Sequence, residues 1–152
     1  RALLGRIALA VARRIYRRFR ERFLPHAFPD LAARGAQAQR VLWASTSTKN
    51  PAYSDVKYVE GLIGPDTVNT MPMATLQAFE DHGRVPGDTA LEGWEEAEAD
   101  LRALARLGID LEEILERLQA EGVDAFRRSY DTLLEALERK RATALTAARP
   151  ID

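Results

Sequence analysis

The chain has 152 residues, enough for one compact domain or for part of a larger one. Its formal net charge of -1 argues against a dedicated nucleic-acid-binding protein, and its lack of cysteine excludes disulfides and thiolate chemistry. It contains no apolar run of about 18 residues, so we expect no membrane span. The missing cysteines fit a cytoplasmic location, and His26 and His82 are too few and too far apart for a histidine metal site.

Residues 2–24 are predicted to form an amphipathic helix. Residues 1–25 hold eight arginines against the single acid Glu21. Such a helix can bind an anionic membrane or a partner protein, or it can pack on a sheet with its arginine stems over the flanks. We favour packing because a strand follows so soon. The apolar stripe repeats at spacings of three and four: Leu4, Ile7, Ala8, Val11, Ile15, Phe19 and Phe23.

Residues 25–39 are expected to be a connection with a short helical turn at 30–34, because Pro25, Pro29 and Gly35 interrupt the helical pattern. His26 is interpreted as a half-buried packing residue rather than a ligand. Residues 41–45 form the first predicted strand, apolar enough to be buried on both faces.

A run of four hydroxyl side chains, residues 45–48, follows this strand, and Lys49 comes next. Asn50 and Pro51 suit the cap and first position of a helix predicted over 51–63. Hydroxyls, a lysine and a helix N-terminus would together form an oxyanion site. An ordinary loop with a helix cap explains the same residues equally well.

Residues 67–71 form the second predicted strand, followed by a helix over 73–82. This β-α-β-α order with short loops predicts two parallel strands joined by a right-handed crossover. The remainder is predicted to be helical over 91–107, over 111–120 with Asp110 as the cap, and over 123–142 after a break at Gly122. We expect residues 147–152 to be frayed.

Two parallel strands do not make a stable sheet by themselves. The chain is therefore predicted to supply one sector of a larger parallel sheet or barrel. The rest would come from a missing N-terminal segment or from a second copy of the chain, and we favour the missing segment. On this interpretation residues 1–152 are the C-terminal segment of a single domain.

Three sequence words, RVLWASTSTKNP, EGLIGPDTVNTMP and LARLGIDLEEILERLQAEGVDAF, closely resemble the C-terminal part of the long-form bacterial transaldolases. The resemblance covers nearly the whole chain. It implies an α/β fold, a (β/α)8 TIM barrel of the class I aldolase type. This chain would provide the last two parallel strands of that barrel with their helices, followed by the C-terminal helices.

The resemblance also implies an activity of the pentose phosphate pathway. A dihydroxyacetone unit would move from sedoheptulose 7-phosphate to glyceraldehyde 3-phosphate, giving erythrose 4-phosphate and fructose 6-phosphate. A lysine Schiff base would carry the unit, without a metal or organic cofactor. The family's Thr-Asn-Pro and Schiff-base lysine motifs are not in this sequence, and neither Lys57 nor Lys140 has a buried strand setting. We therefore expect no catalytic residue here and no activity from this chain alone.

The resemblance carries over a phosphate-binding role to Ser45 or Ser47 together with Lys49, and a weaker pocket-lining role to Asn69 and Thr70. Trp43 is predicted to be a core residue. The implied partners are sugar phosphates and the missing barrel segment, with no nucleic acid and no membrane. A helical interaction module built on the basic N-terminal helix stays an alternative. So does a related class I sugar-phosphate aldolase, and the oligomeric state is left open.

Overall fold

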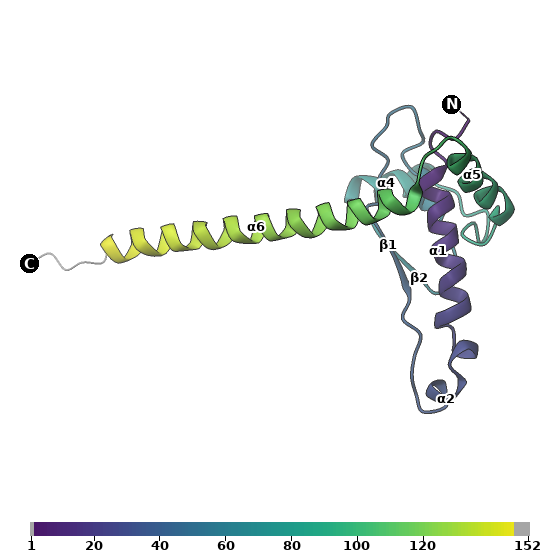
Figure 1. Cartoon of the computed structure of the whole chain (residues 1–152), viewed down its shortest axis with the longest axis horizontal. Coiled ribbons are helices and arrows are strands. Elements are labelled where there is room, and N and C mark those ends of the chain that lie inside the picture. The colour runs from purple at the N-terminus through teal and green to yellow at the C-terminus, as the bar shows by residue number, and fades with distance from the viewer. Residues whose placement is uncertain (1, 148–152) are drawn as a thin grey trace, which may run out of the picture. The chain divides into compact units, whose positions relative to one another are not determined.

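The computed structural model describes residues 2–147 and divides into two compact units, Arg1–Leu107 and Gly108–Asp152. Figure 1 labels elements of both units. In the second unit, the described residues form one helix, α6 (Leu111–Ala147). The first unit contains α1 (Ile7–Phe23), a 3-10 turn (Pro25–Ala27), α2 (Pro29–Ala32), β1 (Val41–Ala44), α3 (Lys57–Glu60), β2 (Thr67–Thr70), α4 (Met73–His82) and α5 (Trp94–Arg106).

β1 and β2 pair in parallel, as the sequence predicts. Val41 lies opposite Thr67 and Ala44 lies opposite Thr70, so the carboxyl ends of the two strands are level. The Val41 N–H donates to the Asp66 carbonyl at 3.1 Å and so points toward β2. Each strand is one residue shorter than predicted, and α4 has the predicted bounds. The described chain is thus an α/β segment with two parallel strands and a helical C-terminal part.

The core lies between α1 and one face of this sheet. It consists of the buried side chains Tyr16, Phe19, Trp43, Leu62 and Ala90. Trp43 is therefore a core residue, as predicted, with 8% of its surface exposed. The Tyr16 hydroxyl donates to the Pro65 carbonyl at 2.7 Å, and burial raises the pKa of that phenol. A Cβ at Gly64 would lie 3.0 Å from the Tyr16 oxygen, so this approach is close enough to favour glycine.

α1 also packs against α5 (Figure 1), and charged side chains join the two helices. Arg6 Nε donates to Asp100 Oδ2 at 2.7 Å, and Arg14 Nε donates to Glu98 Oε1 at 2.9 Å. The Arg14 guanidinium holds the pKa of Glu98 below its ordinary value. Several of the arginines that made α1 look like a membrane or partner helix are therefore used inside the first unit. This packing supports the interpretation of α1 as a helix covering a sheet.

The predicted buried stripe of α1 is only partly correct. Phe19 is buried, but Ile15 and Phe23 are 50% and 48% exposed, while Tyr16, outside the predicted stripe, is 1% exposed. The helix turns its Tyr16 side toward β1 and leaves the Ile15 side uncovered. The apolar face of α1 is therefore wider than the part of this face that the described residues bury.

Three other local predictions are wrong. Residues 51–56 form turns, and the helix predicted over 51–63 is only the single turn of α3. Pro51 and Ser54 favour turns, and the Val56 N–H donates to the Ser54 hydroxyl instead of entering a helix. His26 is exposed rather than half-buried, because the 3-10 turn that carries it projects past the end of α1. α5 begins at Trp94 rather than at residue 91, because Gly93 has a left-handed φ of 64°.

In the second unit, α6 runs through Gly122, where the sequence predicted a break. A glycine inside an exposed helix costs only about 1 kcal/mol relative to alanine, and strong helix formers surround Gly122. Asp110 caps α6 as predicted, since its Oδ1 accepts from the N–H groups of Glu112 and Glu113. The frayed tail predicted for 147–152 lies outside the described residues, apart from Ala147, which ends α6. None of the described helices is both long and apolar enough to cross a membrane.

Candidate functional site

The candidate site lies where β1 and β2 end. Because the parallel register sets Ala44 beside Thr70, the residues that follow β1 come next to the last residues of β2. This edge brings together the predicted residues Ser45, Asn69 and Thr70. In parallel α/β sheets, ligands bind just outside the carboxyl ends of the strands.

A side-chain hydrogen bond ties the two strand ends together. The Thr46 hydroxyl donates to Asn69 Oδ1 at 2.7 Å, and Thr46 is 4% exposed. Ser45, directly before it, has a left-handed φ of 58°, which is uncommon for a residue with a Cβ. This conformation breaks the strand alternation, so Thr46 turns inward while Ser45 stays exposed. Asn69 is therefore held by Thr46, and its predicted pocket-lining role stays a prediction.

The rest of the hydroxyl run differs in its exposure. Ser47 is half-buried and Lys49 is exposed at the end of the run. The Thr48 hydroxyl oxygen is buried and has no hydrogen-bond partner among the described residues. A hydroxyl in that state is uncommon in folded proteins. Ser45, Ser47 and Lys49 thus lie on one continuous loop, with donors that point at least partly toward solvent.

The helix N-terminus that was expected to complete this site is missing from it. Asn50 caps a turn instead, because its Oδ1 accepts from the Ala52 N–H at 2.9 Å. The four-residue α3 starts only at Lys57 and is too short to supply a useful dipole. An anion bound at the strand ends would therefore rely on hydroxyl groups and on the Lys49 ammonium.

Sequence reasoning missed Thr46 and Thr48. Both lie inside the run that was singled out, but the two serines were preferred to the threonines. The useful signal was the pairing of two strand ends, each carrying a short polar side chain that can bridge to the other. A β-branched threonine also restricts its χ1 angle, which suits a fixed bridge better than serine does.

Neither of the two other lysines weighed in the sequence has a buried strand setting. Lys57 is half-buried in α3, and its Nζ lies 4.0 Å from the centre of the Tyr53 ring. Lys140 is exposed on α6. A Schiff-base lysine needs a lowered pKa, which burial or a neighbouring cation usually provides. The described residues thus leave the expectation of no catalytic lysine in place.

An exposed cluster of one histidine and two aspartates, His82, Asp55 and Asp81, lies at the end of α4. His82 Nε2 is 2.9 Å from Asp55 Oδ1, and His82 Nδ1 is 3.0 Å from Asp81 Oδ2. The hydrogen bond with Asp55, and then the one with Asp81, raises the pKa of His82, and the same contact lowers the pKa of Asp55. This cluster ties the turn before α3 to α4. We interpret it as a structural contact.

Parallel α/β proteins bind ligands just outside level strand ends of this kind, and hydroxyls with a lysine beyond the ends would suit an anionic ligand. Residues 2–137 match the family described as Transaldolase/Fructose-6-phosphate aldolase. The chain belongs to this family, which confirms the resemblance of its motifs.

Curated relatives agree with this assignment. The chain is 50% identical over 135 residues to Transaldolase 1 of Streptomyces coelicolor, covering 89% of this chain and 35% of that protein. It is 47% identical over 143 residues to Transaldolase of Parafrankia sp., covering 94% and 39% of the two chains. It is 47% identical over 135 residues to Transaldolase of Neisseria meningitidis serogroup C, covering 89% and 38%. The chain thus spans little more than a third of the length of these relatives.

Proposed function

We propose that this chain is the C-terminal sector of a transaldolase barrel and that it supplies the substrate phosphate site. The complete enzyme would transfer a dihydroxyacetone unit between a ketose phosphate and an aldose phosphate in the cytoplasm. The observation that carries the proposal is the pair of level parallel strand ends, followed by the hydroxyl run and Lys49, in a chain of this family. The Schiff-base lysine would come from outside residues 1–152.

The uncovered side of the sheet supports an incomplete barrel. Leu42 points away from the core and is 56% exposed, although it lies in the middle of a strand. In the described part of the chain, β1 pairs only with β2, so its other edge is free. Exposed apolar strands with free edges bind further strands readily. We propose that the preceding strands of the barrel pair with this edge.

A groove along the same edge is shaped for the neighbouring helix layer. It runs between α1 and β1, has a volume of about 560 Å³, and includes the uncovered Ile15 and Phe23 as well as Leu42. Ile15 and Phe23 belong to the predicted α1 stripe, and the described residues leave both exposed. Exposed apolar side chains that gather along one groove suit an interface with further apolar side chains. Residues 1–152 would thus be one segment of a larger domain rather than a domain of their own.

In the proposed site, Ser45 and Ser47 would donate hydrogen bonds to the substrate phosphate, and Lys49 would neutralise part of its charge. Thr46 holds the loop against Asn69, so the donors on either side of it have fixed positions. Thr70 would line the pocket beside them. Fixed donors bind a phosphate at a lower entropic cost than a mobile loop does.

The test uses a chimera in which this chain replaces the matching part of Transaldolase 1 from S. coelicolor. We expect the chimera to catalyse the transfer and this chain alone to be inactive. Lys49→Ala should raise KM for the phosphorylated sugars about 5- to 30-fold with little change in kcat, because a charge-assisted hydrogen bond contributes about 1–2 kcal/mol. Lys140→Ala is the matched control and should leave KM unchanged. An unchanged KM in the Lys49 variant would exclude the assignment.

A related aldolase is the second candidate, because the description of the family names a fructose-6-phosphate aldolase beside transaldolase. Both reactions use the same imine, and they differ in whether an acceptor aldose or a proton captures the carbanion. Product analysis of the chimera with and without acceptor aldose separates them. Turnover that depends on the acceptor supports the transferase, and release of free dihydroxyacetone supports the aldolase.

A further inference from the structure

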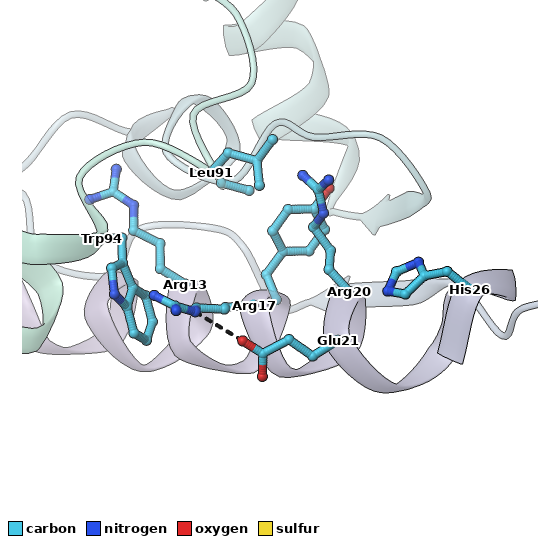
Figure 2. A pocket seen from close by; sticks show the side chains of 9 residues that line it. Arg13, Arg17, Arg20, Glu21, His26, Leu91 and Trp94 are labelled. Atoms are coloured by element: carbon cyan, nitrogen blue, oxygen red, sulfur yellow. Dashed lines mark hydrogen bonds and ion pairs between the residues drawn. The ribbon is translucent and has the colours of Figure 1, made fainter. Parts of the chain in front are cut away.

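A second cavity, outside the candidate site, lies in the first unit between α1 and the segment that leads into α5. Its volume is about 400 Å³, within the usual range for small-molecule pockets. Figure 2 shows three arginines in a row along α1, with His26 beyond the end of this helix and Leu91 on the opposite wall above the gap between Arg13 and Arg20. None of the residues proposed to bind the substrate phosphate lines this cavity.

The arginines share one helix face because they are spaced four and three residues apart. Arg17 is already engaged. Its Nε lies 3.0 Å from Glu21 Oε1, and its guanidinium lies 4.2 Å from the centre of the Trp94 ring. Glu21 is the one acid among the residues that line the cavity, and it is paired with Arg17 rather than with Arg13 or Arg20. Arg13 and Arg20 have no ion-pair partner within residues 2–147.

The Arg13 guanidinium lies close to the backbone at the start of α5. A Cβ at Gly93 would lie 2.8 Å from Arg13 Nη1, and Gly93 also has the left-handed φ that favours glycine. The buried Nε of Arg13 has no hydrogen-bond partner among the described residues. A buried donor without an acceptor is unfavourable, and more so when the group is charged. Arg13 as a whole is half-buried and lines the cavity, so the outer nitrogens of its guanidinium are the donors left for a ligand.

We propose that this cavity binds a phosphate monoester whose phosphate lies between Arg13 and Arg20. The planar guanidinium groups match phosphate oxygens in a two-bond geometry, and two unpaired arginines balance a dianion. Leu91 and the Trp94 ring form an apolar wall that suits a ring or hydrocarbon portion of the same molecule. Inorganic phosphate has the anionic group but lacks a ring or hydrocarbon portion. A comparison of the two ligands therefore distinguishes a site for a phosphate monoester from a site for phosphate alone.

Binding is measured by the fluorescence of Trp94 in the 152-residue chain, titrated with phenyl phosphate and, separately, with inorganic phosphate. Trp94→Phe is the control for the signal, because the core residue Trp43 also fluoresces. We expect a saturable change with phenyl phosphate in the low millimolar range or tighter, and binding at least about tenfold weaker with inorganic phosphate. Equal affinity for phenyl phosphate and inorganic phosphate would mean that the cavity binds only the phosphate group, and it would contradict the proposal of a phosphate monoester.

The double variant Arg13→Gln/Arg20→Gln should weaken phenyl phosphate binding at least about tenfold. Its matched control is Arg18→Gln/Arg22→Gln, which removes the same charge from the same helix at residues that line the groove beside β1. The control should bind within about twofold of the parent chain. Equal losses in both double variants, or no saturable signal in a parent chain with the helical circular dichroism of α1 and α5, would overturn the proposal.

Two further variants keep the result independent of folding and of the proposed function. If Arg13→Gln/Arg20→Gln loses helical signal, Arg20→Gln alone serves, because Arg20 has no ion pair to lose among the described residues. Lys49→Ala should leave the Trp94 signal unchanged, because Lys49 does not line this cavity. Loss of the signal in Lys49→Ala would mean that the phosphate is bound at the strand ends instead, and would overturn the second site.

Discussion

The two sides of the β1–β2 sheet are built from similar residues but meet different surroundings. On one side, Trp43 is buried against Tyr16 and Phe19 of α1. On the other, Leu42 is exposed, and β1 has a free edge in the described part of the chain. An apolar strand therefore does not by itself make a core. One side of the sheet is covered by α1, and the other side is available for the rest of the proposed barrel.

We expect the largest effect on stability at the side of the sheet that packs against α1. Trp43→Ala should lower the free energy of unfolding by about 3–5 kcal/mol, because it removes a buried aromatic side chain from the core. Urea unfolding followed by the fluorescence of Trp94 measures this. A loss below about 1 kcal/mol would mean that α1 does not pack on the sheet as described.

Leu42→Ala is the matched change on the opposite, exposed side of the sheet. In this chain it should cost about 1 kcal/mol or less, because the side chain is 56% exposed. In the chimera with the S. coelicolor segment, the same substitution should cost about 2–5 kcal/mol, because the preceding strands would bury Leu42. The difference between these two losses is the readout. Equal losses in both proteins would contradict the proposed contact.

A smaller effect tests the link between the strand ends. Thr46→Val should destabilise the chain by about 1–2 kcal/mol, because it removes the donor to Asn69 Oδ1 and leaves that oxygen unpaired. Thr48→Val is the control and should be neutral or slightly stabilising, since the Thr48 hydroxyl has no partner among the described residues. Urea midpoints of both variants measure the difference. Similar losses for the two would show that the Thr46 bond does not hold the loop.

The smallest effect is the pH dependence of the His82 cluster. Because the folded-state pKa of His82 is raised above its ordinary value of 6.5, its contribution is full below that value and is lost as the pH rises through the raised pKa. The depressed pKa of Asp55 acts in the opposite sense, and its contribution is lost when the pH falls through it. His82→Asn should therefore destabilise the chain more at about pH 5.5 than at about pH 8.5. His26→Asn is the control, and a pH-independent effect of His82→Asn would contradict the account.

Some of these features follow from local sequence. The alternation of short apolar strands and helices predicted the parallel pair to within one residue, and Pro72 and Gly83 fixed the bounds of α4. Asp110 was recognisable as a cap because its side chain acts on the next turn. These predictions depend on neighbours in the chain, so the residues themselves carry enough information.

Other features depend on contacts that the sequence does not display. The buried face of α1 centres on Tyr16 because Pro65 and Gly64 approach that residue, and both are far away in sequence. The predicted helix over 51–63 gave way to turns because Asn50 and Ser54 bond to nearby backbone N–H groups. The Thr46–Asn69 bridge needs the register and the unusual φ of Ser45. The phosphate roles of Ser45, Ser47 and Lys49 stay predictions.

We propose that β1 is an inner strand of a larger parallel barrel. Hydrogen exchange of individual amides tests it, because Val41 and Trp43 direct their N–H groups toward β2, whereas Leu42 and Ala44 direct theirs to the free edge. We predict that the Leu42 and Ala44 amides exchange rapidly in this chain and at least about 100-fold more slowly in the active chimera, with Val41 and Trp43 protected in both. Rapid exchange at Leu42 and Ala44 in an active chimera would contradict the claim.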